Sequence, residues 1–291
     1  MRNILPASMV TPVTAVLVAV LLLLSFTTPS RLFLSLYPLA REIVAFRIDY
    51  ATRELTSIET GHFIIKYHPL DRETATMVAV SAEEAYEPVG QILNYRPREK
   101  ALVIIYPDRA AMQKAYGWSS NNSAMGFYWG GVIQILSPRV WLADKNSESE
   151  FKQKGPMTHE YTHLVLDYLL KGNYPSWFTE GVAQYAEYKI NAFEWITPNN
   201  FPAQNTYSLR ELDKNFASLP NQSLAYRQSL AIVRYLVENY GENSFNTILL
   251  AMKQGVKIDI AIKNATGLNY REFEEKAKVW AEKTMNFKII S

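Results

Sequence analysis

The sequence predicts an α+β protein, chiefly because of the order of its predicted elements. Segments with strand character occur only in the first half of the chain, among helices, whereas each element predicted after residue 155 is a helix. The chain has 291 residues, 48% of them hydrophobic, which suffices for one large domain or two fused ones. This composition excludes disordered and collagen-like proteins, and the net charge of +2 argues against a dedicated nucleic-acid binder.

The N-terminal segment predicts a membrane anchor. Val13 to Phe26 is uncharged and contains four consecutive leucines, and the 19 uncharged residues from Met9 to Thr27 approach the roughly 20 needed to span a bilayer. Since we find no A-x-A cleavage site before Ser30, we expect residues 1–30 to be an uncleaved signal-anchor. The alternative is a signal peptide whose removal yields a secreted protein.

The orientation of this anchor rests on two opposing signals. The arginines that follow it outnumber Arg2 and the α-amino group before it, which by the positive-inside rule favours a cytoplasmic domain. The signal-like position and the large domain that follows favour export. We expect a single-pass protein of the cell membrane with its main domain outside the cytoplasm. The opposing arginines are Arg31, Arg41 and Arg47.

The elements after the anchor are predicted in order from hydrophobic periodicity. Residues 31–57 are apolar and basic and predict a juxtamembrane helix. Strands are expected at 61–67, 101–106 and 124–136, the last one bent at Gly130-Gly131, and helices at 71–94 and 108–116, with a polar loop at 143–154. Helices then follow at 156–171, 176–189, 208–215, 223–240, 243–253, 257–265 and 269–286.

These elements suggest a mixed subdomain over residues 58–205 and a helical subdomain over residues 206–291. The chain has no cysteine, so disulfides, cysteine nucleophiles and thiolate metal sites are excluded. The chain has four histidines, and any histidine-dependent chemistry must use these. Two of them, His62 and His68, flank a predicted strand six residues apart, and we interpret them as surface or structural residues.

The other two histidines form the strongest chemical motif of the chain, His159-Glu160-Tyr-Thr-His163. On a helix, residues four apart lie about 40° from each other, so both imidazoles share one face and Glu160 adjoins it. Two converging imidazoles suit a zinc ion, and an adjacent carboxylate can accept a proton from zinc-bound water. The alternative is a helix with two chance polar histidines.

A catalytic zinc site usually has three protein ligands, and no histidine follows His163. The third ligand must therefore be a carboxylate. Asp167 lies one turn further on the same helix, where it is better suited to orient an imidazole than to bind the metal beside it. Glu180 lies on the next predicted helix and is our choice, whereas Glu187 is nearly two turns beyond it and is expected on a solvated face.

The helix that carries Glu180 has two further features. Ser176 is expected to cap its N-terminus, and Gly181 is expected to let it approach the helix of the two histidines closely.

The motif His159 to His163, followed by Trp177-Phe-Thr-Glu-Gly-Val-Ala183, resembles the gluzincin metallopeptidases, whose members include thermolysin and aminopeptidase N. Among these the chain looks most similar to the peptidase MA-like family, with weaker likeness over about residues 58–285. The resemblance implies a zincin-like catalytic subdomain at 58–205. It also implies one Zn²⁺ held by His159, His163 and Glu180, with Glu160 as the general base.

Two positions depart from the gluzincin pattern. Thermolysin-like enzymes have an Asp four residues after the ligand Glu, and here that position is Gln184; Asp167 is available to take over the support of the ligands. These enzymes also use a downstream histidine to stabilise the oxyanion, and this chain has none. A tyrosine is the expected substitute, with Tyr226 preferred and Tyr185 the alternative.

The resemblance implies a membrane-anchored zinc metallopeptidase that acts on peptides or proteins. Residues 124–136 are expected to form an edge strand that an extended peptide can join, although an ordinary edge strand fits the same residues. Two other functions use the same site: a zinc-containing module that binds peptides without turnover, and a metal hydrolase of a non-protein amide or ester. A purely structural zinc needs no general base, so Glu160 argues against the first.

Overall fold

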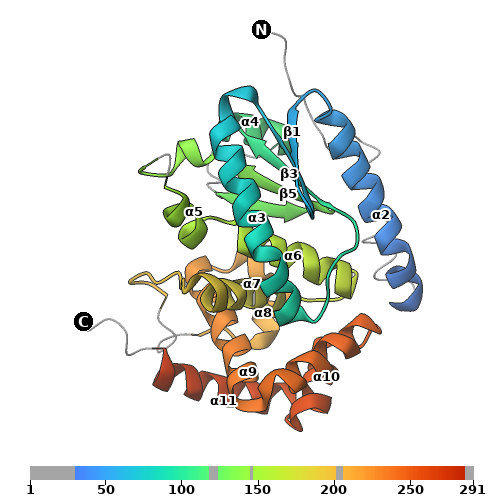
Figure 1. Cartoon of the computed structure of the whole chain (residues 1–291). Coiled ribbons are helices and arrows are strands. Elements are labelled where there is room, and N and C mark those ends of the chain that lie inside the picture. The colour runs from blue at the N-terminus through green and yellow to red at the C-terminus, as the bar shows by residue number, and fades with distance from the viewer. Residues whose placement is uncertain (1–29, 118–123, 145–146, 201–205, 286–291) are drawn as a thin grey trace. The chain divides into compact units, whose positions relative to one another are not determined.

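The computed structural model describes residues 30–117, 124–144, 147–200 and 206–285. Over these residues the chain is an α+β protein, as predicted, with one five-stranded sheet and many helices (Figure 1). They divide into two compact units, one ending at Tyr168 and the other beginning at Leu169. The predicted membrane anchor at 1–30 falls almost wholly outside the described residues. Among the described helices, none is both long enough and apolar enough to cross a bilayer.

The first unit contains the sheet, whose strands are ordered β1-β2-β3-β5-β4. The three central strands run parallel to one another, and both edge strands are antiparallel to their neighbours. The strands are β1 (Thr56–Glu59), β2 (Phe63–Tyr67), β3 (Ala101–Tyr106), β4 (Gly126–Trp129) and β5 (Val132–Leu136).

Helices cover both faces of the sheet. On one face, α2 (Ser30–Ala51) and α4 (Arg109–Tyr116) bury an apolar cluster against β3 and β5. On the other face lie α3 (Arg72–Leu93) and α6 (Met157–Leu170), where Tyr161 of α6 has its ring centroid 5.1 Å from that of Phe63. The cluster on the first face includes Val44, Ile48, Ile104, Met112, Ala115, Val132 and Leu136.

The segment at 124–136 differs from the prediction of one bent strand. It forms a hairpin, in which Trp129 pairs with Val132 across a two-residue turn. Gly130 and Gly131 have φ angles of 57° and 89°, which two-residue hairpin turns require and which side chains disfavour. Within this segment, therefore, only β4 is an edge strand, and β5 lies inside the sheet.

Two other expectations need correction. The predicted helix at 31–57 ends at Ala51, because residues 56–59 form the short edge strand β1. The predicted loop at 143–154 contains α5 (Glu148–Lys154), whose N-terminus is capped by the Ser147 hydroxyl. Pro88 lies within α3 without ending it, and that helix stops at Asn94, which has a left-handed conformation.

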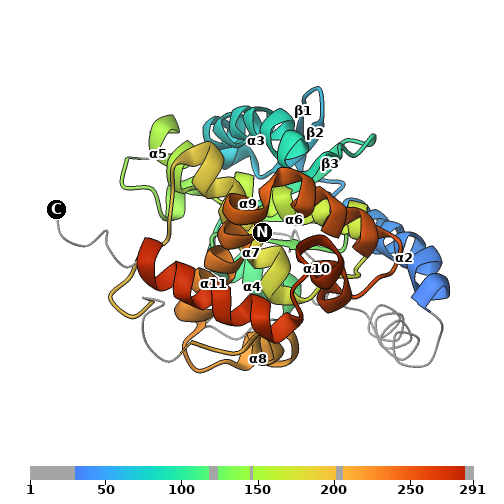
Figure 2. The same ribbon diagram turned by 90° about the horizontal axis from the view of Figure 1, so that it is seen from below.

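The described elements from Leu169 onward are helical. The long helix α9 contacts α7, α10 and α11, and Figure 2 shows α11 running beside it. Gly241 interrupts α9 with non-helical angles, at the break predicted between two helices. The helices are α7 (Ser176–Asn191), α8 (Leu209–Asn215), α9 (Gln222–Lys253), α10 (Ile258–Thr266) and α11 (Tyr270–Thr284). Short 3-10 segments occupy 69–71, 138–140 and 216–218.

Candidate metal centre

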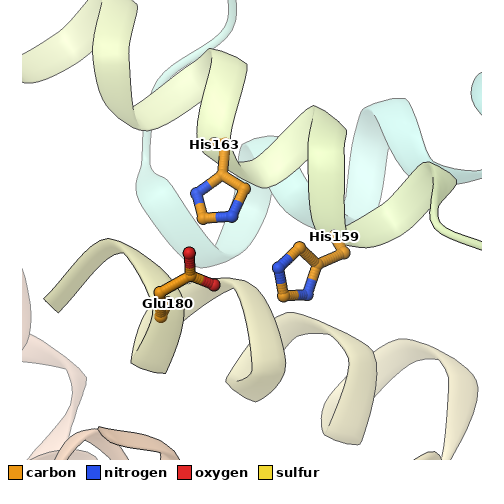
Figure 3. A group of neighbouring side chains, drawn as sticks. All are labelled: His159, His163 and Glu180. Carbon is orange, nitrogen blue, oxygen red and sulfur yellow. The ribbon is translucent and has the colours of Figure 1, made fainter. Parts of the chain in front are cut away.

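The two histidines of the motif lie one turn apart on α6, as their spacing predicted (Figure 3). Their ring centroids are 4.7 Å apart and the ring planes are inclined by 74°. His163 is buried, with 9% of its surface exposed, and His159 is partly exposed. One imidazole is therefore held by surrounding protein while the other borders solvent.

Glu180 of α7 points toward both imidazoles (Figure 3). One ligand atom from each of His159, His163 and Glu180 lies within 4.8 Å of the others. Around a tetrahedral zinc ion, ligands bound at 2.0–2.2 Å are about 3.3 Å apart, so small side-chain rotations bring all three into binding distance. Two imidazoles and one carboxylate are also the donor set of several catalytic zinc sites, so these residues fit the ion.

Glu160 follows His159 on α6 and is buried, with 6% of its surface exposed. Two contacts made by residues near Glu160, one by Tyr161 and one by Pro156, hold the start of α6. Tyr161 is buried against the sheet, and burial raises the pKa of its hydroxyl. A Cβ at Gly126 of β4 would lie 2.8 Å from Cβ of Pro156, so the first residue of β4 touches the beginning of α6.

Asp167 is fully buried one turn after His163, and its carboxylate has three side-chain donors. The hydroxyl of Tyr37 donates to Oδ1 at 2.5 Å, that of Tyr128 donates to Oδ2 at 2.7 Å, and Arg41 lies 3.3 Å from Oδ2. Burial by itself lowers the pKa of Arg41, but its neighbours Tyr128 and Asp167 outweigh this and raise it. The guanidinium therefore remains charged.

No local sequence pattern predicted these three donors to Asp167. Tyr37 and Arg41 come from α2, and Tyr128 comes from β4. The two residues of α2 precede Asp167 by 130 and 126 positions. The role predicted for Asp167, orientation of an imidazole, stays a prediction.

The beginning of α7 is fixed by contacts that differ from those predicted. Ser176 is the first helical residue rather than the cap, which is Pro175. The indole Nε1 of Trp177 donates to Asp213 at 2.6 Å, and burial raises the pKa of that carboxyl.

Gly181 does allow a close helix approach, but the neighbour is α9. A Cβ at this position would lie 2.4 Å from the carbonyl oxygen of Ser229, a distance that real side chains do not adopt. The backbone of α7 next to Glu180 is therefore in close contact with α9.

Tyr226 lies on α9 with its hydroxyl 3.5 Å from Oε1 of Glu180. Gln184 of α7 donates a 2.7 Å hydrogen bond from Nε2 to the carbonyl oxygen of Tyr226, so it links the two helices at this point. The ring of Tyr226 contacts Phe216 and Trp195, with centroids 5.3 and 5.9 Å away. The tyrosine preferred from sequence is thus near a proposed ligand.

Two alternative residues have different surroundings. Tyr185 lies about 140° around α7 from Glu180 and is buried, and burial raises the pKa of its hydroxyl. Glu187 was expected on a solvated face, but it is buried, with 9% of its surface exposed.

The two histidines outside the motif have the surroundings expected of surface or structural residues. His62 is exposed, and its Nδ1 lies 2.7 Å from Glu83, whereas the Nδ1 of His68 accepts a hydrogen bond from the Leu70 N–H.

A comparison with family models identifies the family of the chain. Residues 97–283 fit the family model described as the Peptidase MA superfamily, which is more than half of the chain and includes α6, α7 and most of the helices that follow. No curated protein matches the sequence.

Proposed function

The chain belongs to the Peptidase MA superfamily, and from that premise we propose that it is a zinc-dependent peptidase of the gluzincin type. The observation that carries the proposal is the grouping of His159, His163 and Glu180, whose ligand atoms lie within 4.8 Å of one another. These three residues would hold one Zn²⁺. Residues 58–205 would then be the zincin-like catalytic subdomain, and residues 206–291 a helical subdomain.

Zinc at such a site polarises a scissile carbonyl and makes a water molecule acidic enough to lose a proton near neutral pH. In this proposal the Glu160 carboxylate accepts that proton as general base. It then donates a proton to the leaving amine, which completes peptide hydrolysis without a covalent enzyme intermediate. The position of Glu160 supports this role, because it follows His159 on α6 and adjoins the face that carries both imidazoles.

Tyr226 is proposed to stabilise the developing oxyanion by donating its hydroxyl proton in a hydrogen bond. Its 3.5 Å separation from Glu180 supports the assignment, since such a donor must lie near the zinc ligands. Gln184 would fix the backbone of Tyr226 through its 2.7 Å hydrogen bond. Asp167 is proposed to support the histidine helix from its last turns.

An extended peptide is the proposed substrate, and β4 is the proposed strand that it joins. All four residues of β4 are half-buried, and one side of the strand has no neighbour in the described sheet. The contact between Gly126 and Pro156 links this strand to the start of α6. Main-chain hydrogen bonds would align the peptide along β4, which is how sheet edges commonly bind extended segments.

We also propose that residues 13–26 anchor the protein in the cell membrane with the peptidase outside the cytoplasm. The support is the uncharged sequence of that segment. Protease digestion of intact cells, with a known external protein as marker, tests the orientation. Protection of residues 60–291 while the marker is digested would contradict it.

The decisive experiment for the catalytic proposal is the Glu160→Gln variant. Glutamine has nearly the same shape but cannot accept the proton, so hydrolysis of a peptide library should fall by a factor of about 10² to 10⁴. Zinc content, measured by metal analysis, should stay at one per chain because Glu160 is not needed as a ligand. Glu148→Gln, at an exposed position of α5, is the matched control and should retain full activity.

Two results would redirect the proposal. Equal cleavage by the wild type and Glu160→Gln would remove Glu160 as general base. A zinc-loaded wild type that cleaves no peptide but binds some would favour the peptide-binding module, and one that hydrolyses only non-protein amides or esters would favour the other hydrolase.

A further inference from the structure

Helix α2 has apolar residues on two opposite faces. One face is buried against the sheet and includes Val44 and Ile48. The opposite face exposes large side chains, among them Leu39 with 56% and Phe46 with 69% of their surface accessible. We call this face the α2 stripe; it consists of Leu32, Leu36, Leu39, Ile43, Phe46 and Tyr50.

The spacing of the α2 stripe is that of a coiled coil. Its members follow one another at intervals of four, three, four, three and four residues. At 100° per residue, all six fall within an arc of about 80°. The helix continues through Pro38, which lies about 120° from the centre of the stripe.

We propose that the α2 stripe is a dimerisation surface, on which a second copy of this chain places its own α2 in parallel. In heptad terms, Leu36, Ile43 and Tyr50 take the a positions, and Leu32, Leu39 and Phe46 take the d positions. One of the three a residues, Ile43, is β-branched and two of the three d residues are leucine, a combination that favours parallel two-stranded packing. This inference is independent of the peptidase activity.

The charges beside the stripe favour the parallel orientation. Glu42 and Asp49 take g positions on one side, and Arg47 takes an e position on the other. In a parallel pair, each g residue faces the e residue five positions further along the other helix, so Glu42 meets Arg47 of the second copy, twice per dimer. An antiparallel pair would instead place the acidic g residues of the two helices against each other.

The same charges argue against a lipid surface as the occupant. Helices that lie on membranes have a broad apolar face bordered mainly by lysine and arginine. The α2 stripe is narrow, and the exposed Glu42 and Asp49 border one side of it. Asp49 is paired with Lys66 at 2.7 Å, so it is Glu42 that anionic lipid would repel, whereas a second helix places Arg47 opposite Glu42.

Disulfide cross-linking of the full chain in mild detergent tests the proposal, because the chain has no cysteine of its own. Leu36→Cys and Phe46→Cys, made separately, should each form a covalent dimer on mild oxidation. The two positions are ten residues apart, about 15 Å along the helix, so no antiparallel register brings both within disulfide reach of their own copies. Val80→Cys is the control, since Val80 is an exposed apolar residue of α3.

Charge reversal gives a second measurement on the same protein. Glu42→Lys and Arg47→Glu should each raise the dimer dissociation constant several-fold in sedimentation experiments, because each puts like charges opposite one another twice per dimer. The double variant Glu42→Lys/Arg47→Glu should restore the wild-type constant. A role of either residue in monomer folding would not predict this recovery.

Three outcomes would overturn the proposal. The first is a monomer that yields no covalent dimer from either cysteine. The second is cross-linking of only one of the two cysteine variants, which indicates another orientation. The third is shielding of a polarity-sensitive dye at position 36 without any dimer, which indicates that lipid or residues 1–29 cover the stripe.

Discussion

Two carboxylates on consecutive helices, Asp167 at the end of α6 and Glu180 near the start of α7, have contrasting surroundings. Asp167 is fully buried and accepts from two tyrosine hydroxyls and the guanidinium of Arg41. Glu180 is partly exposed, and the hydroxyl of Tyr226 lies 3.5 Å from its Oε1. Both residues are acidic neighbours of the two histidines in sequence, yet their environments suit different tasks.

The contrast indicates how the protein separates stability from metal binding. A buried carboxylate that accepts from a cation and two hydroxyls has its charge compensated within the protein, so it stabilises the fold. A partly exposed carboxylate close to two imidazoles keeps its charge available to a metal ion. Sequence spacing favoured Glu180 over Asp167 as the third ligand, and the three donors around Asp167 give a second reason for that choice.

The largest expected effect is that of Glu180→Ala. Loss of one of three proposed ligands should remove stoichiometric zinc and reduce peptide hydrolysis below detection, while the fold persists. Metal analysis and circular dichroism of the purified variant check this. A variant that retains one zinc per chain would show that Glu180 is not a ligand.

Asp167→Asn is the opposite test and should act mainly on stability. It leaves the buried Arg41 without its anionic partner, so the free energy of unfolding should fall by about 3–5 kcal/mol in urea titrations. Tyr128→Phe, which removes one neutral donor, should cost about 1 kcal/mol. Loss of zinc from Asp167→Asn with unchanged stability would place this residue in the metal site instead.

Of the three main variants, Tyr226→Phe is expected to have the smallest effect. Removal of an oxyanion donor should lower kcat by about 10²- to 10³-fold, with zinc content and KM nearly unchanged. Tyr185→Phe is the matched control on α7 and should change kcat little. If both variants keep the wild-type kcat, neither tyrosine stabilises the oxyanion.

The local features of α6 and α7 were predictable because they depend on residues close in sequence. Helical periodicity defined α6, and the four-residue spacing put His159 and His163 on one face. Glu180 followed from the need for a third ligand on the next helix. Two short elements were not predicted because they contain too few residues to show a periodic pattern. β1 has four residues, and α5 has seven, although Ser147 caps its N-terminus.

The contacts that support the site were not predictable because they join distant residues. The hydrogen bond from Tyr37 to Asp167 spans 130 positions, and no local pattern marks either partner. The hairpin was missed for another reason. The two glycines lie between two segments of strand character, a pattern that fits either one bent strand or two strands joined by a turn. Only the pairing of Trp129 with Val132 distinguishes these two structures.

The close approach of Gly181 to Ser229 has a consequence for how relatives of this chain can be found. Any side chain at position 181 would push α7 away from α9 and shift the neighbouring Glu180 with it. The acidic residue and the glycine after it should therefore be inherited together. A two-residue Glu-Gly signature, seventeen residues after the second histidine of the first motif, should distinguish functional members from chains that retain only scattered acidic residues.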